Sequence, residues 1–339
     1  QRLQNRLKHY LIIALLSSAS LWAQSGASGV FTFLDRSIFA GASGLGNTGY
    51  VHPGPTGAYA IQNPLLLSDS SMHQLELSRA GLGEGIALTG ASYGFKWKGR
   101  HVMSAIQSVG YGTFEGTDIW GTSLGQFQAS DLALTLGTSL YSYKNWELGA
   151  TVKWISGTYE TYQSNAAATD LVAMYAATGK PTVAIIAKNL GTQITTFSGT
   201  REPLPFNLLL AVGNKLQYAP FRWTMVFDQL QRPYLGYDDP NLVETDPVTG
   251  EQTSTKPSYL NLAMRHVSGS LEFLPTQRMH FMVGYSFRRQ YEMALPSRRT
   301  SGGFTVGTGI YFSKFSLHYA NELRSVAGRM NTVSLSVNI

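Results

Sequence analysis

Residues 131–156 read "DLALTLGTSLYSYKNWELGATVKWIS", and this stretch decides the fold. Apolar side chains occupy every second position, a short turn follows at 142–145, and the alternation then resumes. Leu132, Leu134 and Leu136 share one face, whereas Ala133 and its alternate neighbours share the other. Side chains on a β-strand point to opposite faces in turn, so a period of two is a strand signature. The stretch therefore predicts two antiparallel strands, each with one apolar face.

The apolar face of the second strand has the height of a membrane. Trp146 and Trp154 lie on it eight residues apart, which is roughly 26 Å along a strand that rises about 3.3 Å per residue. A tilt of about 40° leaves roughly 20 Å of height, close to the ~25 Å apolar band of a membrane barrel between its aromatic girdles. The opposite face carries Glu147 and Lys153, as a barrel lumen would. A soluble sandwich also alternates, but it normally carries many more charges on its outer face.

Composition agrees with a fold that keeps much of its surface away from water. Of the 339 residues 43% are hydrophobic and only 14% are charged, whereas soluble domains average about 25% charged residues. After the N-terminal segment, no stretch of apolar residues reaches the ~18 that a spanning helix needs. Because lipid cannot satisfy an open sheet edge, a closed β-barrel is the remaining way to cross. We therefore expect an all-β membrane protein.

The N-terminus predicts export. Arg2, Arg6 and Lys8 form a basic head, the apolar run 11–22 follows, and Ala23 precedes a plausible cleavage point. These three parts indicate a secretory signal peptide over residues 1–23. Its removal lowers the net charge from +6 to +3 (+6 − 3), so the mature chain is only mildly basic and we expect no nucleic-acid partner. Cysteine is absent, which excludes disulfides and a lipidated cysteine after the signal.

Connection lengths predict the strand count. The alternation recurs at 279–288, 304–312 and 333–339. Short turns are expected at 98–99, 142–145, 176–180, 217–220, 275–278 and 313–314. Longer polar connections are expected at 110–126, 157–166, 191–204, 229–265, 289–302 and 322–330, and only 81–85 is brief. Strict alternation of short and long predicts a 14-stranded antiparallel transmembrane β-barrel with the short turns in the periplasm. We divide the chain into a signal peptide (1–23), an N-terminal hatch or plug (24–70) and the barrel (71–339).

Several segments resemble known outer-membrane families. "GLGNTGY" (44–50) followed by "AYAIQNPLLL" (58–67) resembles the hatch of FadL-like barrels, a motif shared with PorV and fatty-acid transporters. More specific segments resemble the PorQ family, outer-membrane components of the type IX secretion system of Bacteroidota. They are "GQFQASDLALTLG" (125–137), "AKNLGTQI" (187–194), residues 201–223, "YDDPN" (237–241) and "LEFLP" (271–275).

The resemblance implies a non-enzymatic role at the outer membrane of a Gram-negative bacterium. It implies an attachment complex with PorU, PorV and PorZ, in which this chain anchors PorZ. Secreted cargo would then be processed and attached to anionic lipopolysaccharide. The alternative is a FadL-type channel for hydrophobic solutes, with the hatch gating the lumen. The small Gly, Ser, Thr and Ala residues on the lumen faces favour the scaffold, and a soluble secreted sandwich is a third reading.

Two loops supply candidate partner-binding residues. The resemblance and the proline-rich or acidic character of these loops select Arg201, Glu202 and Pro203 in one loop, and Tyr237, Asp238, Asp239, Pro240 and Asn241 in the other. The carboxylates of 229–265 could also bind calcium, but their spacing lacks the Gly turn of an EF-hand loop. A solvated acidic loop or a partner surface is the preferred interpretation.

Enzymatic chemistry finds little support in the residues. His73, His101, His266, His280 and His318 are predicted to lie singly on different strands, whereas a hydrolase needs a serine, a histidine and an orienting group together. A His-Glu-x-x-His zinc motif is also absent from the sequence. We therefore expect no catalytic residue, no metal and no cofactor. His280 and His318 are expected to face the lumen as hydrogen-bonded spacers.

Overall fold

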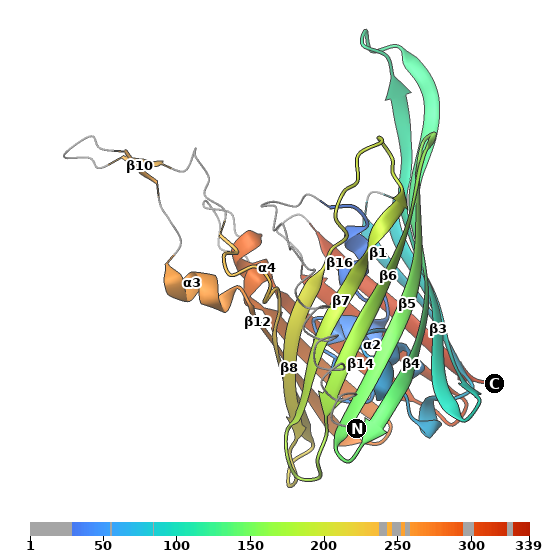
Figure 1. Ribbon diagram of the computed structural model, residues 1–339, viewed down its shortest axis with the longest axis vertical. Helices are drawn as coiled ribbons and strands as arrows, with labels where there is room; N and C mark the ends of the chain where they lie inside the picture. Colours follow the sequence, from blue (N-terminus) through green and yellow to red (C-terminus); the bar gives the residue numbers. More distant parts are fainter. Residues whose placement is uncertain are drawn as a thin grey trace, which may run out of the picture.

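The computed structural model describes residues 29–54, 56–83, 85–236, 243–245, 252–254, 258–293, 302–323 and 328–339. Fourteen antiparallel strands close into one barrel in the order β1-β16-β15-β14-β13-β12-β9-β8-β7-β6-β5-β4-β3-β2. The predicted all-β, 14-stranded antiparallel barrel is thereby confirmed. Figure 1 shows the strands tilted around a common axis, with the short turns at the lower end, called here the turn end. The opposite end, which carries the long connections, is called the loop end.

The barrel strands are β1 (Gln74–Gly83), β2 (Ile86–Trp97), β3 (Arg100–Thr117), β4 (Ser123–Tyr143), β5 (Trp146–Tyr159), β6 (Tyr162–Tyr175), β7 (Thr182–Thr195), β8 (Asn207–Lys215), β9 (Phe221–Phe227), β12 (Val267–Thr276), β13 (Met279–Ser286), β14 (Phe304–Tyr311), β15 (Phe315–Leu323) and β16 (Arg329–Asn338). The connection from β9 to β12 contains the paired strands β10 (Val243–Thr245) and β11 (Gln252–Ser254) and the helix α3 (Tyr259–Met264). Helix α4 (Phe287–Glu292) follows β13.

The alternation of faces along the strands is confirmed. On β4, Thr135 is 2% exposed and faces inward, while the preceding Leu134 is 45% exposed on the outer wall. On β5, Lys153 is buried in the lumen, and Trp146 and Trp154 stand half-exposed on the outside. Large apolar side chains therefore cover the outer wall, which is the arrangement that a barrel in lipid requires.

Two of the predicted long loops are wrong. Residues 157–166 form no loop, because β5 ends at Tyr159 and β6 begins at Tyr162, with Glu160 in the left-handed region (φ 57°). Residues 110–126 belong mostly to β3 and β4. Neither segment shows the regular alternation of apolar and polar residues that marks a strand in lipid. Backbone pairing, which needs no apolar face, builds the strands there.

Strands β3 and β4 continue as a projecting hairpin. The pairs from Thr113↔Gln128 to Thr117↔Ser123 lie beyond the last pairs with neighbouring strands, which are Ala87↔Gly110 and Ala129↔Tyr159. The two strands therefore pair only with each other at this height, and Figure 1 shows them rising well above the barrel. The rings of Phe114 and Phe127 stack across the pair at 5.4 Å. Such cross-strand aromatic pairs stabilise a two-stranded ribbon.

The N-terminal segment 29–73 runs through the lumen. It contains the short helices η1 (Thr32–Asp35), α2 (Ala40–Gly44), η2 (Gly57–Ile61), η3 (Pro64–Leu66) and η4 (Asp69–Ser71). Helix α2 contacts β13 to β16, η2 contacts β1 to β4, and η3 contacts β4 and β5, so the segment reaches opposite walls (Figure 1). Phe39 and Tyr59 of this segment are almost fully buried. The hatch role and the division at 23 and 70 stay predictions, and residues 1–28 lie outside the described residues.

Glycines on the lumen wall permit this packing. A Cβ atom at Gly284 would lie 2.6 Å from the backbone nitrogen of Gly46, and one at Gly307 would lie 2.9 Å from the Cα of Gly44. Backbone therefore packs against backbone, which any larger residue would prevent. The small residues read from the sequence as a lumen face are the surface on which α2 rests.

Candidate functional site

Hydrogen bonds hold the N-terminal segment to the wall around its whole length. The backbone N–H of Ala40 donates to Ser334 Oγ at 2.8 Å, and Arg222 Nη1 donates to the carbonyl of Pro53 at 3.0 Å. Arg36 pairs with Glu322 at 3.3 Å. Buried polar groups rarely go unpaired, and for the groups at these three positions the wall supplies a partner. The barrel is therefore occupied by its own chain at mid-height.

The segment is also fastened at the turn end. Asp69 of η4 pairs with Lys96 on β2, and His101 Nε2 on β3 lies 2.9 Å from Asp69 Oδ1. Donation from Lys96 and then from His101 lowers the pKa of Asp69 to about 2. The carboxylate therefore remains ionised at any physiological pH and ties the end of the segment to two strands.

Buried ionic groups link adjacent strands inside the wall. Lys153 Nζ on β5 contacts Asp170 on β6 at 2.7 Å and Asn189 Oδ1 on β7 at 2.7 Å. Buried ion pairs persist only with good geometry and additional hydrogen bonds, and the amide of Asn189 completes the set. This cluster links three neighbouring strands through their side chains.

Two histidines that are far apart in the sequence lie close together in the structure. His280 and His318 are fully buried on the lumen side, as expected, but their rings lie 6.5 Å apart on separate strands. His280 Nε2 lies 2.9 Å from Glu272 and its Nδ1 lies 2.8 Å from the hydroxyl of Tyr311. Both ring nitrogens of His280 are therefore engaged in hydrogen bonds. The prediction of a hydrogen-bonded spacer is confirmed for His280 and wrong for His318, because neither ring nitrogen of His318 has a hydrogen-bond partner among the described residues.

The first predicted partner-binding loop is described and exposed. Arg201, Glu202 and Pro203 lie at the loop end, where the N–H of Glu202 donates to Gln193 Oε1 at 2.7 Å. The carbonyl of Pro203 accepts from the N–H of Val30 at 3.3 Å. The loop is thus tied both to β7 and to the start of the N-terminal segment. The second predicted group, Tyr237, Asp238, Asp239, Pro240 and Asn241, lies outside the described residues.

Neither a metal centre nor a helical span is found in the described part of the chain. Among those residues, no three or more histidine, aspartate or glutamate side chains gather closely enough to hold a metal ion. None of the helices there is both long and apolar enough to cross a membrane. The acidic stretch considered for calcium falls mostly on residues that are not described.

An aromatic pocket of about 550 Å³ opens at the loop end. It lies between the start of the N-terminal segment, strands β3 to β6 and the 196–206 connection. Its floor holds Asp131, whose Oδ2 accepts from the hydroxyls of Tyr111 at 2.7 Å and Tyr159 at 2.9 Å. Sequence reasoning placed Asp131 on the lumen face without assigning it a role. The sequence feature that could have indicated a role for Asp131 is that it is the one carboxylate on a strand face of Ala, Thr and Gly.

The tip of the β3–β4 hairpin is a second feature that sequence reasoning missed. Ile119 is 88% exposed and Trp120 is 82% exposed, and Leu124 stands beside them. Asp118 Oδ1 accepts from the N–H groups of Trp120 at 2.9 Å and Thr122 at 2.8 Å. Donation from the Thr122 backbone and then from that of Trp120 lowers the pKa of Asp118. Hydrogen bonds therefore fix a turn that displays large apolar side chains to solvent. The sequence feature that could have indicated this tip is the pair "IW" (119–120) inside a polar connection.

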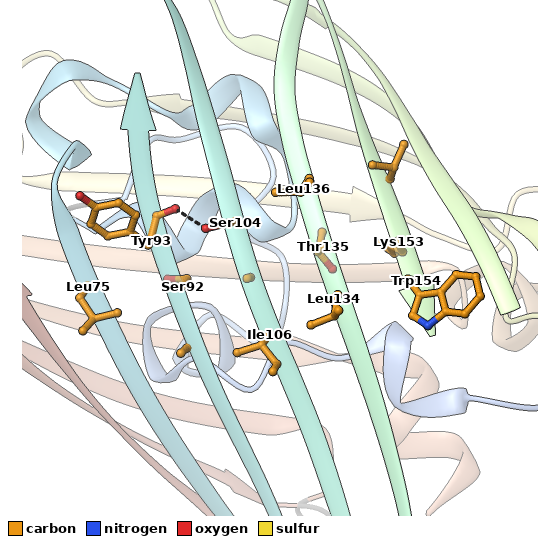
Figure 2. Close-up of a pocket in the computed structure, with 13 residues that line it drawn as sticks. Leu75, Ser92, Tyr93, Ser104, Ile106, Leu134, Thr135, Leu136, Lys153 and Trp154 are labelled. Atoms are coloured by element: carbon orange, nitrogen blue, oxygen red, sulfur yellow. Dashed lines mark hydrogen bonds between the residues drawn. The ribbon is translucent and has the colours of Figure 1, made fainter. Parts of the chain in front are cut away.

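The outer wall over β1 to β5 carries a shallow apolar depression of about 620 Å³. Figure 2 shows Leu75, Ile106, Leu134 and Trp154 around it. The hydroxyl of Ser104, which also borders it, donates to the carbonyl of Tyr93 at 3.2 Å, so this polar group is satisfied without water. A polar group that faces lipid needs such an internal partner. The depression therefore suits acyl chains of the bilayer.

Comparisons with known proteins give a likeness in structure alone. No protein-family model matches the chain, and no curated protein matches its sequence. The toluene transporter TbuX of Ralstonia pickettii matches with a TM-score of 0.54 at 10% identity, over 91% of this chain and 100% of that one. A TodX deltaS2S3 mutant, a monoaromatic hydrocarbon channel, matches with a TM-score of 0.51 at 12% identity, over 89% of this chain and 99% of that one. A FadL homologue of Pseudomonas aeruginosa matches with a TM-score of 0.51 at 10% identity, over 92% of this chain and 100% of that one.

At such low identity these likenesses show the fold. Two of the matched proteins are described as a transporter and a channel, and the third as a FadL homologue. The described strands of this chain close into a barrel and turn their large apolar side chains outward. The chain folds as a closed antiparallel β-barrel of 14 strands that is similar in fold to FadL-like barrels.

Proposed function

We propose that this barrel is a scaffold that holds a soluble partner at the cell surface. The observation that carries the proposal is the ordered hairpin with an apolar tip above a barrel whose lumen is occupied. Exposed tryptophan is costly in solvent and is among the commonest anchors of protein interfaces. A tip that projects beyond the bilayer cannot bury its side chains in lipid. Contact with a protein partner therefore explains the exposure of Ile119 and Trp120 better.

The motifs that resemble the PorQ family supply the identity of the partner. On this proposal the hairpin and the loop at 201–203 hold PorZ, beside PorU and PorV in the type IX attachment complex of Bacteroidota. Cargo would be processed there and attached to anionic lipopolysaccharide. Arg201 and Glu202 are exposed beside the mouth of the barrel, and the acidic group 237–241 would supply a second contact. Surface charges of this kind set association rate and specificity more than affinity.

The hairpin tip gives a direct test. Ile119→Ser combined with Trp120→Ala removes the apolar tip and leaves Asp118 and its turn in place. We expect a folded barrel, judged by heat-modifiable gel mobility, and release of PorZ from the surface into the medium. Tyr218→Ala is the matched control, because Tyr218 is 94% exposed at the turn end. That variant should retain PorZ.

A second variant separates the hairpin from the long loop. Replacing residues 237–257 by a Gly/Ser link should weaken PorZ capture while the barrel still assembles. If both variants retain all PorZ but loss of the whole protein releases it, the contact belongs to 201–203 and the hairpin assignment is wrong. If PorZ stays on cells that lack the protein, the scaffold proposal falls.

A FadL-type channel for hydrophobic solutes is the second candidate. The fold likeness to TbuX and TodX favours it, because these are described as a toluene transporter and a monoaromatic hydrocarbon channel. A channel requires the N-terminal segment to leave the contacts that now hold it in the lumen. Toluene uptake by cells with and without the protein decides between the two. The scaffold predicts equal uptake, whereas the channel predicts a clear loss without the protein.

A further inference from the structure

We propose that the aromatic pocket at the loop end binds a small organic cation, a substituted ammonium group carried by a soluble solute. The pocket has room for such a ligand, at about 550 Å³. Its lining combines the two features that recognise organic cations, aromatic faces and carboxylates. This site is separate from the hairpin tip and does not depend on the scaffold function.

Aromatic rings form the walls of the pocket. They are Phe31, Tyr111, Tyr159, Tyr162 and Phe197. The centroids of Tyr159 and Phe197 are 4.7 Å apart, those of Phe31 and Phe197 are 6.0 Å apart, and those of Tyr111 and Tyr159 are 6.0 Å apart. Rings at these separations and tilts form a concave cage and not one flat stack. A cation within ~6 Å of several ring faces gains from each of them.

The aspartate and glutamate residues that line the pocket have no basic residue beside them in its lining. Asp131 lies in the floor and Glu202 at the rim, and the described lining contains no lysine, arginine or histidine. Within the described residues, no cation forms an ion pair with Asp131. Its two tyrosine hydroxyls donate hydrogen bonds but bring no positive charge. A carboxylate with 1% exposure normally has a charged partner, and a bound cation would supply that charge.

The start of the N-terminal segment closes one side of the cage. Phe31 adopts a left-handed backbone (φ 58°), which turns the chain over Phe197, and the N–H of Val30 donates to Pro203. A ligand in the cage would therefore contact both the barrel wall and this segment. Binding should slow hydrogen exchange at the N–H of Val30, which gives a readout beside affinity.

Choline and 3,3-dimethylbutan-1-ol are the probes, because they have the same shape and differ in charge. Titration calorimetry on the full chain in detergent measures both. We expect choline to bind at least about tenfold more tightly than the neutral alcohol. Phosphocholine tests a lipid headgroup as the source, and we expect weaker binding, because its phosphate meets the two carboxylates. Equal binding of choline and the alcohol, no binding of choline, or tighter binding of phosphocholine would each overturn the proposal.

Variants localise the effect. Asp131→Asn keeps the shape of the side chain and removes its charge, and we expect about a tenfold loss of choline affinity. Glu202→Gln at the rim should cost less, and it keeps the test open if Asp131→Asn fails to assemble. Glu115→Gln is the matched control, an exposed carboxylate on the hairpin outside the pocket. If Asp131→Asn and Glu202→Gln both bind choline as tightly as Glu115→Gln, the site lies elsewhere and the assignment is wrong.

Discussion

Leu134 and Thr135 are adjacent in the chain and meet opposite surroundings. Leu134 stands 45% exposed on the outer wall, whereas Thr135 is 2% exposed inside a lumen filled by the N-terminal segment. The cost of a substitution therefore depends on which face the residue occupies more than on its position along the strand. Both faces therefore restrict substitution: the lipid face excludes polar side chains, and the packed lumen excludes larger ones.

Leu134→Arg should lower the amount of assembled barrel. The substitution places a charge on the lipid face near mid-height, at a cost of about 2–4 kcal/mol for a barrel in a bilayer. Leu124→Arg is the control, because Leu124 lies on the same strand but is 72% exposed at the hairpin. Heat-modifiable mobility of outer-membrane extracts measures both. Equal loss in the two variants would contradict a lipid-facing Leu134.

Gly284→Val should displace helix α2 from the wall. Its Cβ would lie 2.6 Å from the Gly46 nitrogen and from the Leu45 carbonyl carbon, which are backbone atoms that cannot rotate away. Overpacking of this kind costs about 1–3 kcal/mol, so we expect faster hydrogen exchange over 40–48. Gly269→Val is the control, because its Cβ meets only the Thr224 oxygen at 3.5 Å. Unchanged exchange in Gly284→Val would show that α2 is not seated on this strand.

At the scale of an element, the β3–β4 hairpin shows how a polar sequence builds an ordered strand pair. Its ladder from 113 to 128 has no neighbouring strand on either side, so the turn and the Phe114–Phe127 pair must hold it. Asp118 organises that turn by accepting two backbone N–H groups, as turn aspartates commonly do. Local hydrogen bonds and one aromatic pair, and not a core, hold the element together.

Order in this turn should depend on pH in one direction. The folded pKa of Asp118 lies below the unfolded value of 3.8, so its contribution is present above that value and is lost as the pH falls through the folded pKa. We expect protected N–H groups of Trp120 and Thr122 at pH 6 and weaker protection in strong acid. Asp118→Ala should abolish the protection at both pH values. Protection that survives in Asp118→Ala would assign the order to the strands alone.

At the scale of the whole molecule, closure of the sheet decides the topology. Because the number of antiparallel strands is even, the first residue of β1 and the last residue of β16 lie at the same end of the barrel, and these two strands pair to close it. The long connection between β9 and β12 and the projecting hairpin share the other end (Figure 1). In outer-membrane barrels the short turns face the periplasm and the longer loops face outward. We therefore expect the loop end outside the cell.

Trypsin added to intact cells tests this orientation. Lys256 lies in the β9–β12 connection, and Lys144 is exposed in the tight turn between β4 and β5. Cleavage at Lys256 should occur on intact cells, and cleavage at Lys144 only after the outer membrane is permeabilised. The reverse pattern would invert the barrel and move the proposed partner surface to the periplasm.

The sequence by itself determined the barrel, because the period of two and the spacing of Trp146 and Trp154 are local properties that lipid and lumen impose directly. It also determined the lumen side of His280 and His318, which follows from strand parity. The tertiary structure alone decided which residues meet. Ring closure sets His280 beside His318, and the path of the N-terminal segment sets Phe31 against Phe197 above Asp131. The hairpin escaped prediction because backbone pairing needs no apolar face, and so leaves no periodic trace in the residues that form it.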